Sequence, residues 1–134
     1  MLPIEFTVPG APLSSQTHNR ARLQGWKLSV ATAAAAAWPP GEAPYGGAVR
    51  VVVVYYYDTR PADVDNFHKP IQDALSGVIY VDDPQVDDAA PSKRNINGRF
   101  RVRGMSRVLA DAFVEGQEFV YVRVEVAPDP ADLI

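Results

Sequence analysis

The sequence predicts a single α+β domain, residues 1–134, in which a mixed β-sheet is packed by two main helices and a shorter helix in the C-terminal half. Two observations predict this class. The chain is 47% hydrophobic, which suffices for one substantial core. Its 134 residues are too few for two domains that each have a core of this kind. Segments with strand-like and helix-like apolar periodicity also follow one another along the chain.

The first half of the chain is expected to form a strand, a helix and a second strand. Residues 2–8 are typical of a strand, which Pro9-Gly10 ends. Residues 20–38 have the apolar spacing of a helix, with the alanine run 33–37 facing the core and a Pro-Pro-Gly stop after it. Residues 48–57 are β-branched or aromatic almost throughout, which predicts a central strand that is buried on both faces.

The second half is expected to alternate short helices and strands. The expected helices cover residues 65–76, with Gly77 as a C-cap, and residues 105–113. The expected strands are residues 78–81, 86–95, 100–102 and 118–126. A hairpin turn at residues 95–98 is expected to join the second of these strands to the third. Residues 127–134 are expected to form a flexible tail.

Carboxylates and one lysine gather between residues 63 and 86. Asp63 and Asp65 lie two apart, so both side chains leave the same face if the chain is extended there. Asp65, Lys69 and Asp73 are spaced by four, so they form one stripe on a helix that begins near Asp65. A further pair, Asp82-Asp83, follows shortly after this helix. The spacing predicts one shared site.

Several carboxylates in a small volume repel one another, and a hard divalent cation relieves that repulsion. Mg²⁺ fits, because it accepts carboxylate oxygens and leaves positions for phosphate oxygens and an activated water. A calcium EF-hand is excluded by Phe67, His68 and Ala74, which stand where that loop needs a polar ligand, a glycine and a glutamate. For a single aspartate the alternative is structural, with Asp65 as an N-cap and Asp83-Pro84 as a turn.

The pattern D-x-D-N-x-x-K-x-x-x-D-A-L-x-G followed by D-D-x-Q-V resembles the signature of the RusA family of Holliday junction resolvases. The opening Ile4–Pro12 also resembles the first strand and turn of that family. The matching positions are Asp63, Asp65, Asn66, Lys69, Asp73, Ala74, Leu75, Gly77, Asp82, Asp83, Gln85 and Val86. The resemblance implies a RusA-like fold and a small homodimeric, magnesium-dependent endonuclease that resolves four-way DNA junctions by paired symmetric nicks in recombination and repair.

The resemblance also implies roles for individual residues. Asp63, Asp65 and Asp83 correspond to metal-binding aspartates that hold one or two Mg²⁺ ions per subunit, and Lys69 corresponds to a catalytic lysine. Neighbouring side chains of an extended segment point to opposite faces, so only one of Asp82 and Asp83 is expected to reach the ion. Asp83 is the expected ligand and Asp82 the alternative, and the other member of the pair caps or braces the turn.

One departure from the family is Ala62, which stands where some members have an arginine, although Arg60 could reach the same phosphate. The departure leaves open an alternative in which the chain is a catalytically impaired protein of the same fold that binds branched DNA.

Charge is segregated along the chain, whose net charge is −3. Residues 58–88 carry a formal charge of −6 and residues 93–107 carry +6. The basic block is a candidate phosphate-binding surface, and the alternative is a solvated strand edge guarded by cations. The expected DNA-binding residues are Arg60, Lys93, Arg94, Arg99, Arg101 and Arg103.

The composition limits the other possibilities. There are no cysteines, so disulfides and thiolate metal sites are excluded. The N-terminus lacks the pattern of a secretory signal, and the longest apolar stretch, residues 31–38, is too short to span a bilayer. A cytoplasmic location is expected, with branched DNA and a second copy of the chain as partners and no membrane.

Overall fold

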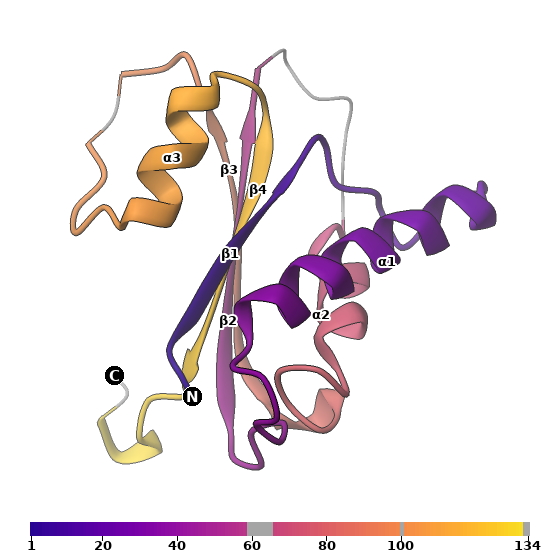
Figure 1. Cartoon of the computed structure of the whole chain (residues 1–134), viewed down its shortest axis with the longest axis vertical. Coiled ribbons are helices and arrows are strands. Elements are labelled where there is room, and N and C mark those ends of the chain that lie inside the picture. Colours follow the sequence, from indigo (N-terminus) through magenta and orange to yellow (C-terminus); the bar gives the residue numbers. More distant parts are fainter. Residues whose placement is uncertain (59–65, 100, 133–134) are drawn as a thin grey trace.

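The computed structural model describes residues 1–58, 66–99 and 101–132, which form a four-stranded mixed sheet between helices (Figure 1). The sheet order is β1-β4-β2-β3. The strands are β1 (Ile4–Pro9), β2 (Val49–Tyr57), β3 (Val86–Asn95) and β4 (Phe119–Val126). Strand β4 is antiparallel to both of its neighbours, β1 and β2, whereas β3 is parallel to β2. The expected α+β class with a mixed sheet is confirmed.

The helices α1 (Arg20–Ala37) and α2 (His68–Leu75) lie on one face of the sheet, and α3 (Arg107–Glu115) lies on the other (Figure 1). The larger core fills the α1 and α2 side, where Val51 and Val53 of β2 meet Val30 of α1 and Ile71 of α2. A smaller cluster on the α3 side joins Tyr56, Leu109, Phe119 and Tyr121. The sheet therefore has one extensively covered face and one partly covered face.

Strand β2 occupies the centre of the sheet as expected, but its two faces are unequally buried. Val49, Val51 and Val53 are at most 1% exposed, whereas Val52 and Val54, which alternate with them on the other face, are only half-buried. The expectation of burial on both faces was wrong because the short α3 covers less of the sheet than α1 and α2 do. An apolar run in a strand indicates that both faces of the sheet are at least partly buried. It does not show how completely helices cover each face.

Helix α1 begins and ends close to the expected residues. Asn19 caps it, since the side-chain oxygen of Asn19 accepts a hydrogen bond from the Arg22 backbone N–H at 3.0 Å. The alanine run does not face the core as a whole: Ala34 is fully buried, but Ala35 and Ala36 are exposed. A helix turns by about 100° per residue, so consecutive residues cannot share one face.

Helix α2 is shorter than expected at its N-terminal end. It begins at His68, because Asn66 has a left-handed backbone (φ +54°) and Phe67 is the N-cap without a side-chain capping bond. Pro70 therefore lies in the first turn, as expected, where no backbone donor is missed. Gly77 follows the Ser76 cap with φ +84°, the conformation that ends helices.

The expected strand at residues 78–81 was wrong, because this segment is a turn. The backbone N–H groups of Val78 and Ile79 both donate to the Leu75 carbonyl at 3.0 Å, and Tyr80 makes only isolated bridges with Tyr45 and Ser76. Ile79 and Tyr80 are fully buried. Burial alone accounts for the apolar run in this segment, without an extended conformation.

After β3 the chain does not form the expected hairpin. Residues 95–98 do turn, with the Gly98 N–H donating to the Asn95 carbonyl at 3.0 Å. Of the expected return strand, Phe100 lies outside the described residues, and Arg101 and Val102 are not in a strand. Val102 instead packs against the smaller core cluster beside α3. Val102 is therefore partly buried on the α3 face of the sheet and does not pair with the outer edge of β3.

The C-terminal half otherwise agrees with the expected order, with small shifts in the bounds. Helix α3 begins two residues late, after Ser106, whose Oγ accepts a hydrogen bond from the Leu109 N–H at 3.2 Å. Within the tail, residues 130–132 form one 3-10 turn. Among the described residues no helix has the length and apolar character needed to cross a membrane.

Candidate active site

Lys69 lies between two carboxylates that are distant in the sequence. Its Nζ donates to Asp73 Oδ1 at 2.8 Å and to Asp83 Oδ2 at 3.1 Å. The first contact is the expected stripe along α2, one helical turn apart. The second joins the beginning of α2 to the turn that precedes β3. About half of the Lys69 side chain (50%) remains exposed, so a ligand can reach it.

The electrostatics of this cluster favour its charged form. The hydrogen bonds to Asp73 and then Asp83 raise the pKa of Lys69, although burial works in the opposite direction. Burial acts to raise the pKa of Asp73, but the hydrogen bond and charge of Lys69 outweigh it, with further contributions from Asp83 and then Lys27, so the pKa of Asp73 is lowered. The lysine is therefore held as an ammonium between two carboxylates.

Tyr80 is a buried neighbour of this cluster. It is fully buried, and its hydroxyl donates to the Gln72 carbonyl at 2.8 Å. Burial raises the pKa of Tyr80, and the negative charges of Asp83, Asp73 and Asp82 raise it further. Tyr80 thus stays neutral, as a buried member of the larger core beside the carboxylates.

Gln85 fixes the turn that carries the Asp82-Asp83 pair. Its Oε1 accepts hydrogen bonds from the backbone N–H groups of Val81 at 2.7 Å and Asp82 at 2.9 Å. Its Nε2 donates to the carbonyls of Tyr45 at 2.7 Å and Gly47 at 2.8 Å. One side-chain amide therefore uses both acceptor positions and both donors to tie this turn to the loop before β2.

Asp82 and Asp83 have different roles in that turn. Asp82 caps the short 3-10 helix Asp83–Gln85, and its side chain accepts a hydrogen bond from the Asp83 N–H at 2.8 Å. Asp83 instead faces Lys69 through Oδ2. Its other oxygen, Oδ1, is buried without a hydrogen-bond partner among the described residues. A carboxylate oxygen without a partner is the donor type that a hard divalent cation prefers.

The described residues do not by themselves complete a metal site. Within residues 1–58, 66–99 and 101–132 there is no group of three side chains of the ligating types close enough to hold an ion. Asp63 and Asp65, the other two aspartates expected as ligands, lie outside the described residues, as does Arg60. The structure thus brings Lys69 and Asp83 together and leaves the role of the two earlier aspartates a prediction.

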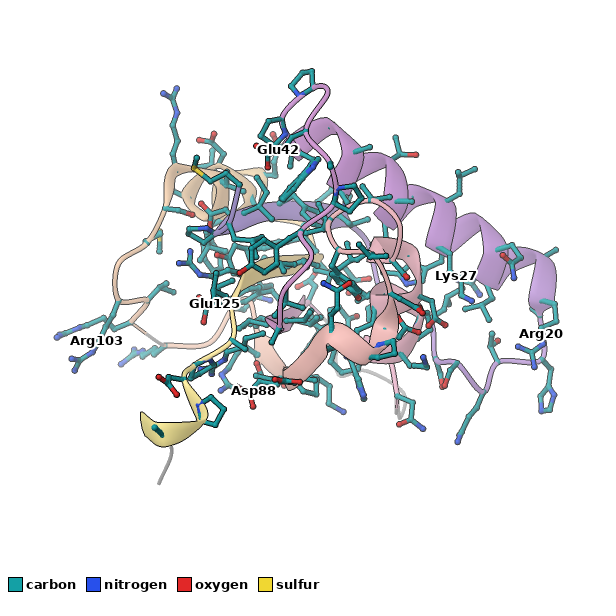
Figure 2. All side chains as sticks on the ribbon, turned by 90° about the horizontal axis from the view of Figure 1, so that it is seen from below. Arg20, Lys27, Glu42, Asp88, Arg103 and Glu125 are labelled. Carbon is teal, nitrogen blue, oxygen red and sulfur yellow. The ribbon has the colours of Figure 1, made fainter. Side chains whose placement is uncertain are left out.

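The expected DNA-binding residues that the structure describes are exposed, and two of them, Lys93 and Arg94, lie on opposite faces of the sheet. Lys93 pairs with Tyr55, whose ring is in the larger core, so Lys93 lies on the α2 face. Arg94 pairs with Tyr56 of the smaller core, so Arg94 lies on the α3 face. Figure 2 shows Arg103 at the opposite end of the molecule from Lys27.

These cations have no carboxylate partner within residues 1–58, 66–99 and 101–132. Among the described residues none of the following forms an ion pair: Lys93, Arg94, Arg99, Arg101 and Arg103. All five side chains are exposed. Exposed cations without carboxylate partners are available to an external anion.

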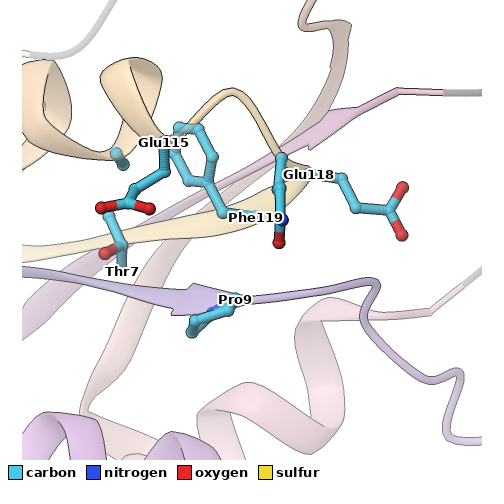
Figure 3. A pocket seen from close by; sticks show the side chains of 7 residues that line it. Thr7, Pro9, Glu115, Glu118 and Phe119 are labelled. Carbon is cyan, nitrogen blue, oxygen red and sulfur yellow. The ribbon is translucent and has the colours of Figure 1, made fainter.

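A hollow of about 310 Å³ between β1 and the C-terminal end of α3 is separate from this cluster (Figure 3). Glu115 and Thr7 lie on one side of it, whereas the Glu118 side chain points away from them. The Glu118 carboxylate instead accepts a hydrogen bond from the Tyr55 hydroxyl at 3.1 Å. Burial, together with Glu118, raises the pKa of Tyr55 to about 12. The hollow contains neither Lys69 nor Asp83.

The geometry agrees with a comparison to known families. A family model described as endodeoxyribonuclease RusA matches residues 9–103, well over half of the chain. The chain belongs to the RusA family. Membership implies endonuclease activity on branched DNA junctions, and the matched span includes α1, α2, the Asp82-Asp83 turn and all of β3. A comparison with curated proteins finds no match.

Two features of this RusA-family site were not found from the sequence. Gln85 belongs to the D-D-x-Q-V pattern, but the pattern does not show that its amide reaches Tyr45 and Gly47. Lys27 contacts Asp73 from α1, with 3.5 Å between Nζ and Oδ2. Nothing in the sequence around Lys27 indicates this contact, because its partner Asp73 lies on another helix.

Proposed function

We propose that this chain is a magnesium-dependent, structure-specific endodeoxyribonuclease that acts as a homodimer and resolves four-way DNA junctions by paired nicks. Asp63, Asp65 and Asp83 are the proposed metal ligands, and Lys69 is the proposed catalytic lysine. This assigns to the chain the specific form of the nuclease activity that RusA-family membership implies.

The observation that carries the proposal is the meeting of Lys69 with Asp83. Their side chains are 3.1 Å apart, although the rest of α2 and a turn separate them in the sequence. Asp83 Oδ1 is buried and has no hydrogen-bond partner among the described residues. An acid that offers one oxygen to an ammonium and keeps the other without a partner supports a role at a cation beside a catalytic lysine.

The chemistry proposed for these residues is electrostatic. When bound, Mg²⁺ would supply Lewis-acid stabilisation of the phosphoryl oxygens and activate the attacking water. Asp83 would contribute Oδ1 to the ion. The ammonium of Lys69, half exposed beside it, would stabilise the charge that develops on the phosphate in the transition state. Gln85 and Asp82 would hold the turn so that Asp83 keeps this place.

DNA contact is proposed through the exposed cations of the basic block. Lys93 would contact DNA on the same face as Lys69, whereas Arg94 and Arg103 would contact it from the other side of the sheet. A branched substrate has several arms, so different arms could meet these two surfaces. Arg103→Ala is expected to weaken binding similarly for all junction sequences, because phosphate contacts carry no sequence information directly.

The test is a synthetic four-way junction incubated with the purified protein, with and without Mg²⁺, and examined for paired nicks. Asp83→Asn is expected to abolish nicking, while binding stays equal or becomes tighter because a negative charge near phosphate is removed. Asp87→Asn is the matched control, since Asp87 is exposed on the same segment and makes no ion pair with another described residue.

The alternative, a catalytically impaired protein that binds branched DNA, predicts junction binding without Mg²⁺-dependent nicking by the unaltered chain. Lys69→Ala gives a further separation: nicking should slow by orders of magnitude with little effect on the fold if the lysine acts on the phosphate. If Asp83→Asn lost junction binding to the same extent as it lost nicking, this result would count against the nuclease proposal.

A further inference from the structure

Lys27 reaches the candidate site from α1, outside the residues that match the family signature. Its Nζ lies 3.5 Å from Asp73 Oδ2, and its side chain is only 27% exposed. The other oxygen of that carboxylate, Oδ1, accepts the hydrogen bond from Lys69 at 2.8 Å. Figure 2 shows Lys27 on the side of α1 that is next to α2. Asp73 therefore joins two ammonium groups that come from two helices.

The charge balance of the cluster depends on this contact. Lys69 faces two carboxylates, because its Nζ is also 3.1 Å from Asp83 Oδ2. With Lys27 present, two ammonium groups meet two carboxylates and the formal charge of the cluster is zero. Without Lys27, one ammonium would serve both acids, and the partly buried Asp73 would carry an unbalanced charge.

The contact also restricts how the side chains move. A lysine has a flexible four-carbon stem, and holding its ammonium in one place costs conformational entropy. An acceptor that is itself held by a second lysine has fewer orientations, so it defines the position of Lys69 more narrowly. Both oxygens of Asp73 are engaged, one by each helix.

We propose that Lys27 is a positioning residue for Lys69: it binds one oxygen of Asp73 so that the other oxygen keeps the Lys69 ammonium beside Asp83. Helix α1 thus contributes to catalysis through its packing against α2 and not through contact with the phosphate. The kinetic consequence rests on the proposed nuclease function.

The first test measures single-turnover cleavage of a four-way junction by Lys27→Met at saturating protein and Mg²⁺. The expected rate is about 3 to 30 times lower than that of the unaltered chain, because a misplaced catalytic group loses rate without losing binding. Arg20→Met is the matched control: it removes the same charge from the same helix, at an exposed residue that makes no ion pair with another described residue. Lys27→Arg should restore most of the rate.

Two kinetic results would overturn the inference. An unchanged cleavage rate at saturation, together with weaker binding and a salt dependence reduced by about one phosphate contact, would make Lys27 a direct DNA contact. Lys27→Met is also expected to have no further effect in the Lys69→Ala background, since its action passes through Lys69. Equal slowing in both backgrounds would show that Lys27 acts independently.

The second test needs neither DNA nor metal. The shift in the urea unfolding midpoint caused by Lys27→Met should disappear in the Asp73→Asn background, because the same contact is already lost. If the midpoint shifts of Lys27→Met and Asp73→Asn are additive while the unaltered chain cleaves junctions, this inference fails and the proposed function stands. If the unaltered chain cleaves no branched DNA, the proposed function fails, and the kinetic role of Lys27 fails with it.

Discussion

Gln85→Glu is expected to lower the free energy of unfolding by about 2 to 4 kcal/mol at neutral pH. The new carboxylate can still accept the hydrogen bonds from Val81 and Asp82, at 2.7 and 2.9 Å in the unaltered chain. It cannot donate to the carbonyls of Tyr45 and Gly47, which Nε2 reaches at 2.7 and 2.8 Å. Two lost hydrogen bonds cost about 1 kcal/mol each, and the facing oxygens and the two nearby aspartates add repulsion.

The assay is urea denaturation at pH near 7. Gln16→Glu is the control, because Gln16 is exposed and its side chain makes no hydrogen bond with another described residue; its effect should stay within about 0.5 kcal/mol. Protonation of the new carboxyl restores one donor, so the deficit of Gln85→Glu should shrink as the pH falls. If the two variants unfold at the same urea concentration, the Gln85 amide does not hold the Asp82-Asp83 turn and the reasoning is refuted.

Two other predictions concern the two faces of the sheet. Ala34→Leu should destabilise the fold by about 1 to 3 kcal/mol in urea, because Ala34 is fully buried, whereas Ala35→Leu on the exposed side should change little; equal effects would contradict the packing of α1. Burial, reinforced by the hydrogen bond to Glu5, raises the pKa of Tyr121 to about 12. The folded state holds the hydroxyl proton of Tyr121 more tightly than the unfolded chain does. The contribution of this group to the free energy of unfolding is therefore complete below pH about 10 and is lost as the pH rises toward 12. Tyr121→Phe should therefore flatten the fall in urea midpoint between about pH 10 and 12, and an identical fall in both proteins would exclude this contribution.

Local signals in the sequence predicted most elements of the fold. Apolar periodicity, the Asn19 cap and the prolines that bound the segments gave α1, β2, β3 and β4 to within two residues. The errors arose where local pattern and tertiary burial give the same signal. The apolar residues 78–81 are buried in a turn and not in a strand, and Val102 packs beside α3 instead of pairing with β3.

For the candidate site, the sequence identified the residue types and the tertiary structure decided which of them meet. The spacing of four between Lys69 and Asp73 was enough to predict their contact, because it follows from the geometry of one helix. No local rule relates Lys69 to Asp83, Gln85 to Tyr45, or Lys27 to Asp73, since each pair joins different elements.

The sequence by itself therefore determined the chemistry that this protein carries, namely acids, a lysine and a basic block in the pattern of a RusA nuclease. Only the tertiary structure decided that Asp82 caps a turn while Asp83 faces Lys69, and that the basic block divides between the two faces of the sheet. The physical reason is that side-chain chemistry is local to each residue, whereas the packing of helices and strands fixes which side chains share a volume.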